Sequence, residues 1–302
     1  MSYLWNGIQF LLNNNIKVIK TQNDRVRKRS SFMHNVFSNR FIADEISDFI
    51  SNNWNGLTYI SHKYIINDQL KIEWNVVDVM GNNESYELDE RMLKIIYGLY
   101  KNSVCFKKDS CELVRIGFWN TPFIKYLPFD SDIELDYFHI NSGCTYNYSH
   151  KNIGDVYIWR EQEWIKTLFH EITHAFKYDN DIEHFGFCCS NSNLGNEAYV
   201  EWIGILMTLL YLSKNEKQFI KKYNNFLKHN KKNMDIIIPY YNKRKQDGRM
   251  KVNLFGYWIL NSYFWKMPKK LTNQIIKDKL HINKSTEQNI AKYLHNKVNK
   301  II

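Results

Sequence analysis

Cysteine, glycine and proline are scarce in this sequence. Among 302 residues there are 5 cysteines, 12 glycines and 4 prolines. The cysteines are odd in number and show no CxxC spacing, so the sequence indicates neither a disulfide framework nor a zinc ribbon. A hydrophobic fraction of 44% with only 24% charged residues also excludes a disordered chain. The sequence therefore predicts a folded globule from a reducing compartment.

Long hydrophobic runs are also missing. The longest apolar run, Ile203 to Leu212, is about half as long as a bilayer-spanning helix and is typical of a buried helix. Near the N-terminus, the apolar stretch from Tyr3 to Leu12 has no basic residue before it and is followed by Asn13 to Asn15, unlike a secretion signal. We therefore expect an intracellular, cytoplasmic protein with no signal peptide and no transmembrane segment.

What the sequence has instead is positive charge and many aromatic side chains. The formal net charge is +10, and 16% of the residues are aromatic. A basic chain can bind nucleic acid, a membrane surface or an acidic substrate, and the charge alone does not choose among these partners. The chain is also rich in Asn, Ile and Tyr, so a biased coding composition is favoured over function as the origin of the lysines.

The apolar pattern changes along the chain from alternating to helical. Helices are expected at 41–50 and 88–100, and strands at 57–66, 70–80, 113–119, 133–140 and 156–159. From Glu161 onward the spacing stays mostly helical, with a polar loop at 178–195 and turns near Pro239, Gly248 and Pro268. Strands first and helices later predict an α+β fold with a mixed β-sheet and a helical C-terminal part.

The chemically informative motif lies in the helix expected from Glu161 to Phe176. His170 and His174 enclose Glu171 in an HExxH sequence. Residues four apart on a helix lie on one face, about 5–6 Å apart, so the two imidazoles can bind one zinc ion. Glu171, at the edge of that face, can hold a water and take its proton during attack on a carbonyl. The motif therefore indicates a zinc site with a general base.

A catalytic zinc needs a third protein ligand. A metzincin-type histidine is excluded, because Lys177 and Asn180 occupy the positions where that class has other residues. A second apolar helix is expected to begin at Asn196, and it carries Glu197 and Glu201 four residues apart. We assign Glu197 as the third zinc ligand and Glu201 as the acceptor for an imidazole N–H, which would orient that ring. The reverse assignment of the two glutamates stays open.

The sequence from His170 to Phe176, HEITHAF, followed by NEA from Asn196, resembles the gluzincin metallopeptidases, especially their thermolysin-like and neprilysin-like branches. This resemblance implies a zincin-like fold, one Zn²⁺ held by His170, His174 and Glu197, and peptide-bond hydrolysis with Glu171 as catalytic base. Thermolysin-like members have an aspartate where this chain has Glu201. The resemblance covers about residues 161–212 and does not identify a substrate.

The resemblance also suggests two further elements of the site. Gluzincins bind substrate backbone along an edge strand some 25–30 residues before the first histidine, which corresponds to Asn141 and Gly143 here, although a plain turn fits these residues equally well. Family members also place a Tyr, His or Arg from the C-terminal part at the oxyanion, and Tyr257 and Tyr263 are candidates. Neither an NAFW nor a GxMEN stretch is present, and the second absence disfavours an aminopeptidase.

The sequence thus predicts a zinc metallopeptidase in three regions. Residues 1–80 would form an N-terminal helix and hairpin region, 81–214 the zincin catalytic region, and 215–302 a helical subdomain that closes the cleft. The expected partner is a peptide or protein, with acidic segments favoured by the net charge. Two alternatives stay open: an inactive zincin-fold binder, and a basic nucleic-acid or membrane-surface protein with structural zinc. Nucleic acid is disfavoured because no recognition module accompanies the lysine-rich stretch at 217–232.

Overall fold

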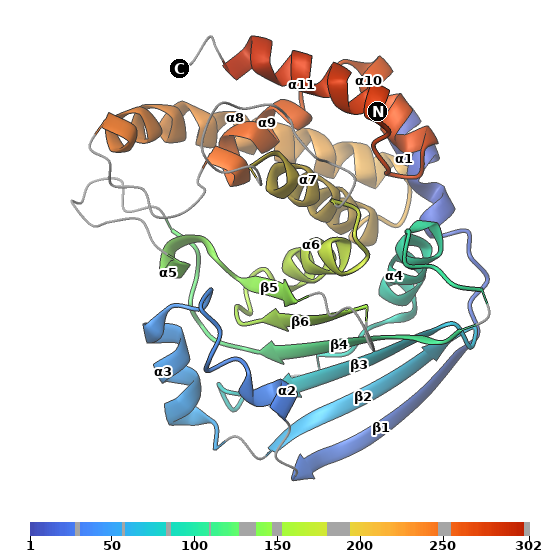
Figure 1. Cartoon of the computed structure of the whole chain (residues 1–302), viewed down its shortest axis with the longest axis vertical. Coiled ribbons are helices and arrows are strands. Elements are labelled where there is room, and N and C mark those ends of the chain that lie inside the picture. The colour runs from blue at the N-terminus through green and yellow to red at the C-terminus, as the bar shows by residue number, and fades with distance from the viewer. Residues whose placement is uncertain are drawn as a thin grey trace.

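The computed structural model describes residues 1–27, 31–55, 58–82, 86–108, 110–126, 137–146, 153–179, 194–246 and 255–298. These residues form a mixed α+β fold in which helices cover a six-stranded sheet (Figure 1). The α+β class and the mixed sheet predicted from the sequence are confirmed.

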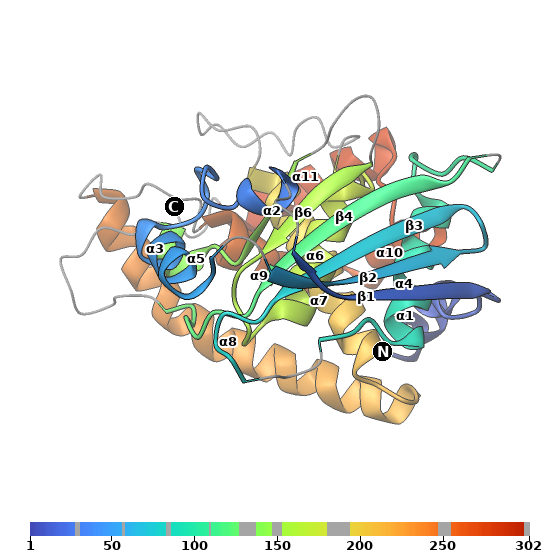
Figure 2. The same cartoon turned by 90° about the horizontal axis from the view of Figure 1, so that it is seen from below.

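The sheet has parallel strands in its centre and antiparallel strands at both sides. Its strands are β1 (Val18–Arg27), β2 (Thr58–Ile66), β3 (Leu70–Val77), β4 (Glu112–Trp119), β5 (Gly143–Tyr146) and β6 (Gly154–Ile158). They lie in the order β1-β2-β3-β4-β6-β5, as Figure 1 shows, and Figure 2 shows β1 to β4 and β6 from below. The pairs β3–β4 and β4–β6 are parallel, whereas β5 runs antiparallel to β6. The short strand β5 is therefore an edge strand.

The helices are unequal in length and most lie in the second half of the chain. In the described residues they are α1 (Ser2–Ile8), η1 (Gln9–Leu11), α2 (Ser31–His34), α3 (Asp44–Asn53), α4 (Glu90–Asn102), α5 (Tyr137–Ile140), α6 (Trp164–Ala175), α7 (Leu194–Tyr211), α8 (Glu216–Gln246), η2 (Phe255–Leu260), α9 (Asn261–Phe264), α10 (Lys269–Lys277) and α11 (Lys284–Val298). Of these described helices, none combines the length and the apolar character needed to cross a membrane.

Two apolar cores lie on opposite faces of the sheet. One face packs against α2 and α3 through side chains such as Phe32, Ile46 and Trp54. The other face packs against α4, α6 and α7, and this larger core continues into α8 to α11. Consequently α6 and α7 lie between the sheet and the layer of C-terminal helices (Figure 1). The larger core contains side chains from all three regions defined on the sequence.

Local sequence signals explain several elements. The predicted hairpin of β2 and β3 turns at Asn67 and Asp68, whose φ angles of 51° and 56° suit a tight hairpin turn and are well tolerated by these two residue types. The helix α4 begins after Asp89, whose side chain accepts a hydrogen bond from the Met92 N–H at 2.8 Å. Both signals are local: they set the turn between β2 and β3 and the first residue of α4.

One strand prediction is wrong. Residues 137–140 form the helix α5, and the rest of the predicted strand at 133–140 lies outside the described residues. Phe138 packs its ring against Phe123, and its carbonyl accepts a hydrogen bond from the buried guanidinium of Arg160. Phe138 therefore packs and forms this hydrogen bond as part of a helical turn, not as part of a strand. The strands β1 and β5 were not anticipated from the apolar pattern.

The helices α6 and α7 approach each other closely at Gly204. A Cβ atom at this position would lie 3.1 Å from the N, Cα and Cβ atoms of His170. Glycine therefore allows α7 to pack directly against the backbone of His170. This contact brings Glu197 and Glu201, two turns and one turn before Gly204, to the imidazoles of α6.

Candidate metal centre

Three side chains from α6 and α7 converge on one point. The Nε2 atoms of His170 and His174 lie 3.6 and 3.5 Å from the same carboxylate oxygen, Oε2 of Glu197. One potential ligand atom from each residue lies within 4.8 Å of the others. Two imidazoles and a carboxylate in this arrangement can hold a metal ion. The three residues are the ones that the sequence suggested as ligands.

The other ring nitrogen of each histidine faces a carboxylate. Nδ1 of His170 lies 2.9 Å from Oε2 of Glu201, and Nδ1 of His174 lies 2.8 Å from Oδ2 of Asp179. In the neutral tautomer whose Nδ1–H donates to each carboxylate, both Nε2 lone pairs are directed at the shared point. Glu201 therefore occupies the position expected for the orienting carboxylate, whereas Asp179 was missed by the sequence reasoning.

Glu171 lies beside the two histidines and is buried, with 5% of its surface exposed. Its Oε2 accepts a hydrogen bond from Oγ1 of Thr145 at 2.8 Å, and the same hydroxyl lies 2.9 Å from the Glu171 carbonyl. Burial raises the pKa of Glu171 above its usual value, against the lowering effect of His170 and His174. A raised carboxyl pKa suits a group that takes up a proton and then releases it.

The carboxylates and imidazoles shift one another's pKa values. Burial lowers the pKa of His170, but its contacts with Glu197 and Glu201 outweigh this effect, so the pKa lies above the usual value. The pKa of His174 is raised still further, with Glu197 and Asp179 outweighing burial. Burial raises the pKa of Glu197 and Glu201, but neighbouring cationic groups dominate and hold both carboxyl pKa values far below the usual range. Both glutamates are therefore carboxylates at neutral pH.

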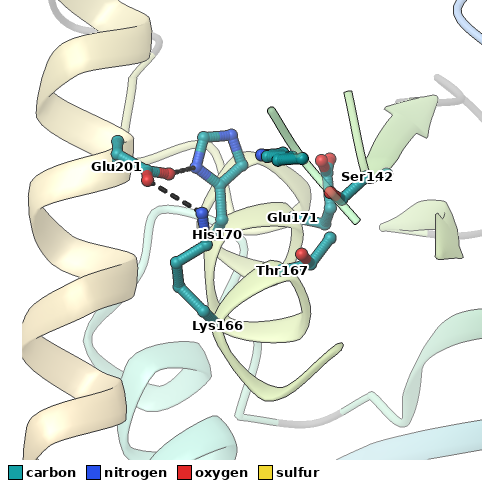
Figure 3. A pocket seen from close by; sticks show the side chains of 8 residues that line it. Ser142, Lys166, Thr167, His170, Glu171 and Glu201 are labelled. Atoms are coloured by element: carbon teal, nitrogen blue, oxygen red, sulfur yellow. Dashed lines mark hydrogen bonds and ion pairs between the residues drawn. The ribbon is translucent and has the colours of Figure 1, made fainter. Parts of the chain in front are cut away.

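Behind His170, alternating charges continue the network. Lys166 Nζ lies 2.9 Å from Glu201 Oε1 and 3.1 Å from Glu163 Oε2, and Lys125 Nζ lies 3.1 Å from Glu163 Oε1. Figure 3 shows Glu201 between His170 and Lys166. Burial raises the pKa of Glu163, but Lys125 and Lys166 outweigh it and lower this pKa to about 2. The position of His170 thus depends on ion pairs that extend away from the metal centre.

The residues suggested for substrate binding lie at the start of β5. Gly143 is the first residue of this edge strand, and a Cβ there would lie 2.8 Å from the Tyr157 carbonyl oxygen and 3.0 Å from Cγ of Glu171. Glycine is needed for this close approach of β5 to α6. The Asn141 side chain donates to the Phe41 carbonyl at 3.2 Å, and its own carbonyl accepts from Arg160 Nε at 2.7 Å. Asn141 therefore shapes the turn that enters β5.

The two tyrosines suggested for the oxyanion lie in the C-terminal part. Tyr257 belongs to η2, but its side chain lies outside the described part of the structure. Tyr263 belongs to α9, where Lys266 Nζ lies 5.6 Å from its ring centroid and its carbonyl lies 3.4 Å from the Tyr293 hydroxyl. The contacts described for Tyr263 do not include the two histidines or Glu171.

The chain was compared with protein-family models, with curated proteins and with solved structures, and none of the three comparisons finds a match. The assignment of the site therefore depends on the geometry of the chain itself.

Proposed function

We propose that this protein is a zinc metallopeptidase with a zincin-like fold. One observation carries the proposal: the Nε2 atoms of both HExxH histidines lie within 3.6 Å of one Glu197 oxygen, while their Nδ1 atoms contact other carboxylates. Two histidines that only formed ion pairs would not need both Nε2 atoms directed at one oxygen and both Nδ1 atoms directed at other carboxylates. The buried Glu171 beside them supplies a group that metal binding alone does not require.

The donor set fits zinc better than calcium or magnesium. Two imidazole nitrogens and one carboxylate oxygen are typical of catalytic Zn²⁺ sites, whereas Mg²⁺ and Ca²⁺ prefer oxygen ligands alone. Three protein ligands leave one coordination position for water or substrate, while structural zinc sites are closed by a fourth protein ligand. When bound, zinc supplies Lewis acidity that polarises a carbonyl and lowers the pKa of water.

The residues around the metal centre have separate roles in the proposed reaction. Glu171 takes the proton of the attacking water and passes it to the leaving amine, and Thr145 orients its carboxylate through the 2.8 Å hydrogen bond. Glu201 and Asp179 keep the histidines in the tautomer whose Nε2 atoms can bind metal. Among the described residues, the edge strand β5, which begins at Gly143, has a neighbouring strand on one side alone, so an extended peptide can lie along its other side. Tyr257 and Tyr263 remain proposed donors to the oxyanion.

The test combines zinc content with peptide cleavage. Purified protein should contain about one zinc per chain and should cleave members of an unbiased peptide library. The Glu171→Gln variant should keep its zinc and lose activity by about 10²–10⁴-fold, the usual contribution of a general base. Glu90→Gln, which removes an exposed carboxylate from the start of α4, is the matched control and should cleave like the wild type.

Two results would contradict the proposal in different ways. If the wild type holds stoichiometric zinc and cleaves no peptide, the chain is a metal-binding protein and the peptidase assignment fails. If Glu171→Gln cleaves as fast as the wild type, the assigned base is wrong even though the protein is a peptidase.

A further inference from the structure

A larger cavity adjoins the metal centre on the side of Lys166 and Glu201. Its volume is about 530 Å³, and its walls come from the segment before α6, from α8 and from Trp258 of η2. A second cavity of about 290 Å³ shares Lys166, Glu201 and Trp258 with it, so the two are adjacent. Lys166 and Glu201 also line the small cavity at Gly143, His170 and Glu171 that Figure 3 shows. The larger cavity is therefore a neighbour of the position where the proposed peptide bond would be cleaved.

The polar side chains of this cavity offer more donors than acceptors. His229, Asn230 and Asn233 project from α8, and Trp258 faces them, with none of these side chains in a hydrogen bond among the described residues. The Lys166 ammonium has three N–H groups, of which the carboxylates of Glu163 and Glu201 occupy two. Several N–H groups therefore face the cavity and can bind a ligand.

The carboxylates that line the cavity are already engaged. Glu163 accepts hydrogen bonds from Lys125, Lys166 and the Ser142 hydroxyl. Glu201 contacts Lys166 with one oxygen and His170 with the other. Both anions are thus compensated inside the fold, so an incoming anion would meet the N–H groups of the cavity rather than a free carboxylate.

Apolar side chains also line both cavities. Ile236 and Ile237 line the larger cavity, and Ile205, Leu209 and Phe226 line the smaller one. These side chains can cover the aliphatic part of a substrate residue while the lysines bind its charged end.

We propose that this cavity binds a carboxylate of the peptide substrate close to the cleaved bond, with Lys125 and Lys166 as the residues that recognise it. The proposal rests on the proposed peptidase function and gives that site a substrate class. The carboxylate can be an acidic side chain or the free C-terminus of the peptide, because both present the same chemical group to the two ammonium groups.

The test uses the zinc-loaded full-length protein and one set of peptides. The set carries Glu or Gln at each position within a few residues of the cleaved bond, and each member is made with a free or an amidated C-terminus. We expect kcat/KM to be about tenfold higher for the Glu peptides if a side chain is recognised, or for the free acids if the terminus is recognised. Lys125→Gln should reduce the ratio of kcat/KM between the preferred peptides and their neutral counterparts towards one. The control Lys228→Gln removes one exposed charge from α8 and should leave the ratio unchanged.

The outcomes separate this proposal from the peptidase assignment. If the wild type cleaves Glu and Gln peptides, and acids and amides, at equal rates, the cavity proposal is overturned while the peptidase function stands. If nothing is cleaved, fluorescence anisotropy measures binding of the same labelled peptides to Glu171→Gln. If the peptides that carry a carboxylate bind more tightly than their neutral counterparts, and if Lys125→Gln weakens that binding, the result supports the cavity proposal even though the protein is not a peptidase. Equal binding of all peptides would overturn the cavity proposal.

Discussion

At the scale of single residues, the two orienting carboxylates differ in how well the sequence indicates them. Glu201 was predictable because it follows Glu197 by one helical turn and must share its face. Asp179 was not, because it follows α6 after Lys177, whose φ of 60° lies in the left-handed region and reverses the chain. The reversal carries Asp179 back to His174, and Asn196 donates to the Asp179 carbonyl at 3.3 Å. The hydrophobic periodicity of the sequence does not predict such a turn.

Removal of the Asp179 side chain should weaken metal binding. In Asp179→Ala the Nδ1–H of His174 loses its acceptor, so the ring is no longer held with Nε2 towards the centre. We expect the zinc dissociation constant to rise about 10–100-fold, as measured by competition with a chromogenic chelator. Asp235→Ala, which removes an exposed carboxylate from α8, is the control. Equal affinities of wild type and Asp179→Ala would show that His174 is oriented by other groups.

Glu163 should make the fold sensitive to acid. Its pKa is lowered from 4.5 to about 2 in the folded protein, so its stabilisation is fully present above pH 4.5 and is lost as the pH falls towards 2. The shift corresponds to roughly 3 kcal/mol of unfolding free energy. We expect Glu163→Gln to be less stable than the wild type at pH 7, with a difference that shrinks below pH 4.5. Urea unfolding at several pH values measures this, and a difference that is independent of pH would contradict it.

At the scale of elements, three long helices were predictable, whereas the edge strands β1 and β5 were not. The helices α4, α6 and α7 carry apolar side chains at helical spacing over three or more turns, and this pattern determines them. The four residues of β5 are too few for an alternating pattern. Their conformation depends on pairing with β6 and on contact with α6, which are tertiary interactions.

A side chain at Gly204 should disturb both helices of the site. In Gly204→Ala the new methyl would press on the His170 backbone at 3.1 Å, and α6 would have to move by a few tenths of an ångström. We expect about 1 kcal/mol lower stability, because overpacking outweighs the better helix propensity of alanine, and weaker zinc binding. Gly204→Val should be worse in both respects. Chemical denaturation and zinc titration measure the two effects, and an alanine variant with wild-type zinc affinity would contradict this prediction.

At the scale of the whole molecule, the sequence indicated the class of fold but not its arrangement. The order of strands and helices along the chain was enough to expect an α+β protein. The arrangement depends on long-range contacts that no local pattern contains. For example, the N-terminal helix α1 packs against α8 and α10 from the far end of the chain.

Zinc should stabilise the whole fold. Ligands from α6 and α7 are brought together only in the folded chain, so bound zinc contributes about 4 kcal/mol when its free concentration is about 1,000 times Kd. We expect a chelator to lower Tm by several degrees and to abolish cleavage, and readdition of zinc to restore both. Glu197→Gln, with a weakened site, should show little change in Tm on chelation. A wild-type Tm that is unaffected by chelation would contradict a bound metal in the native state.

The hydrogen bond from Thr145 to Glu171 has a consequence for how activity is lost. The proposed general base, Glu171, lies on α6 like two of the metal ligands, but its carboxylate is oriented by Thr145 of a four-residue strand at the margin of the sheet. Edge segments open by local fluctuations far more readily than core helices unfold. Mild heat or denaturant should therefore produce a form that retains its metal and its helical circular dichroism while catalysis has already ceased. For such a protein, inactivation would precede melting.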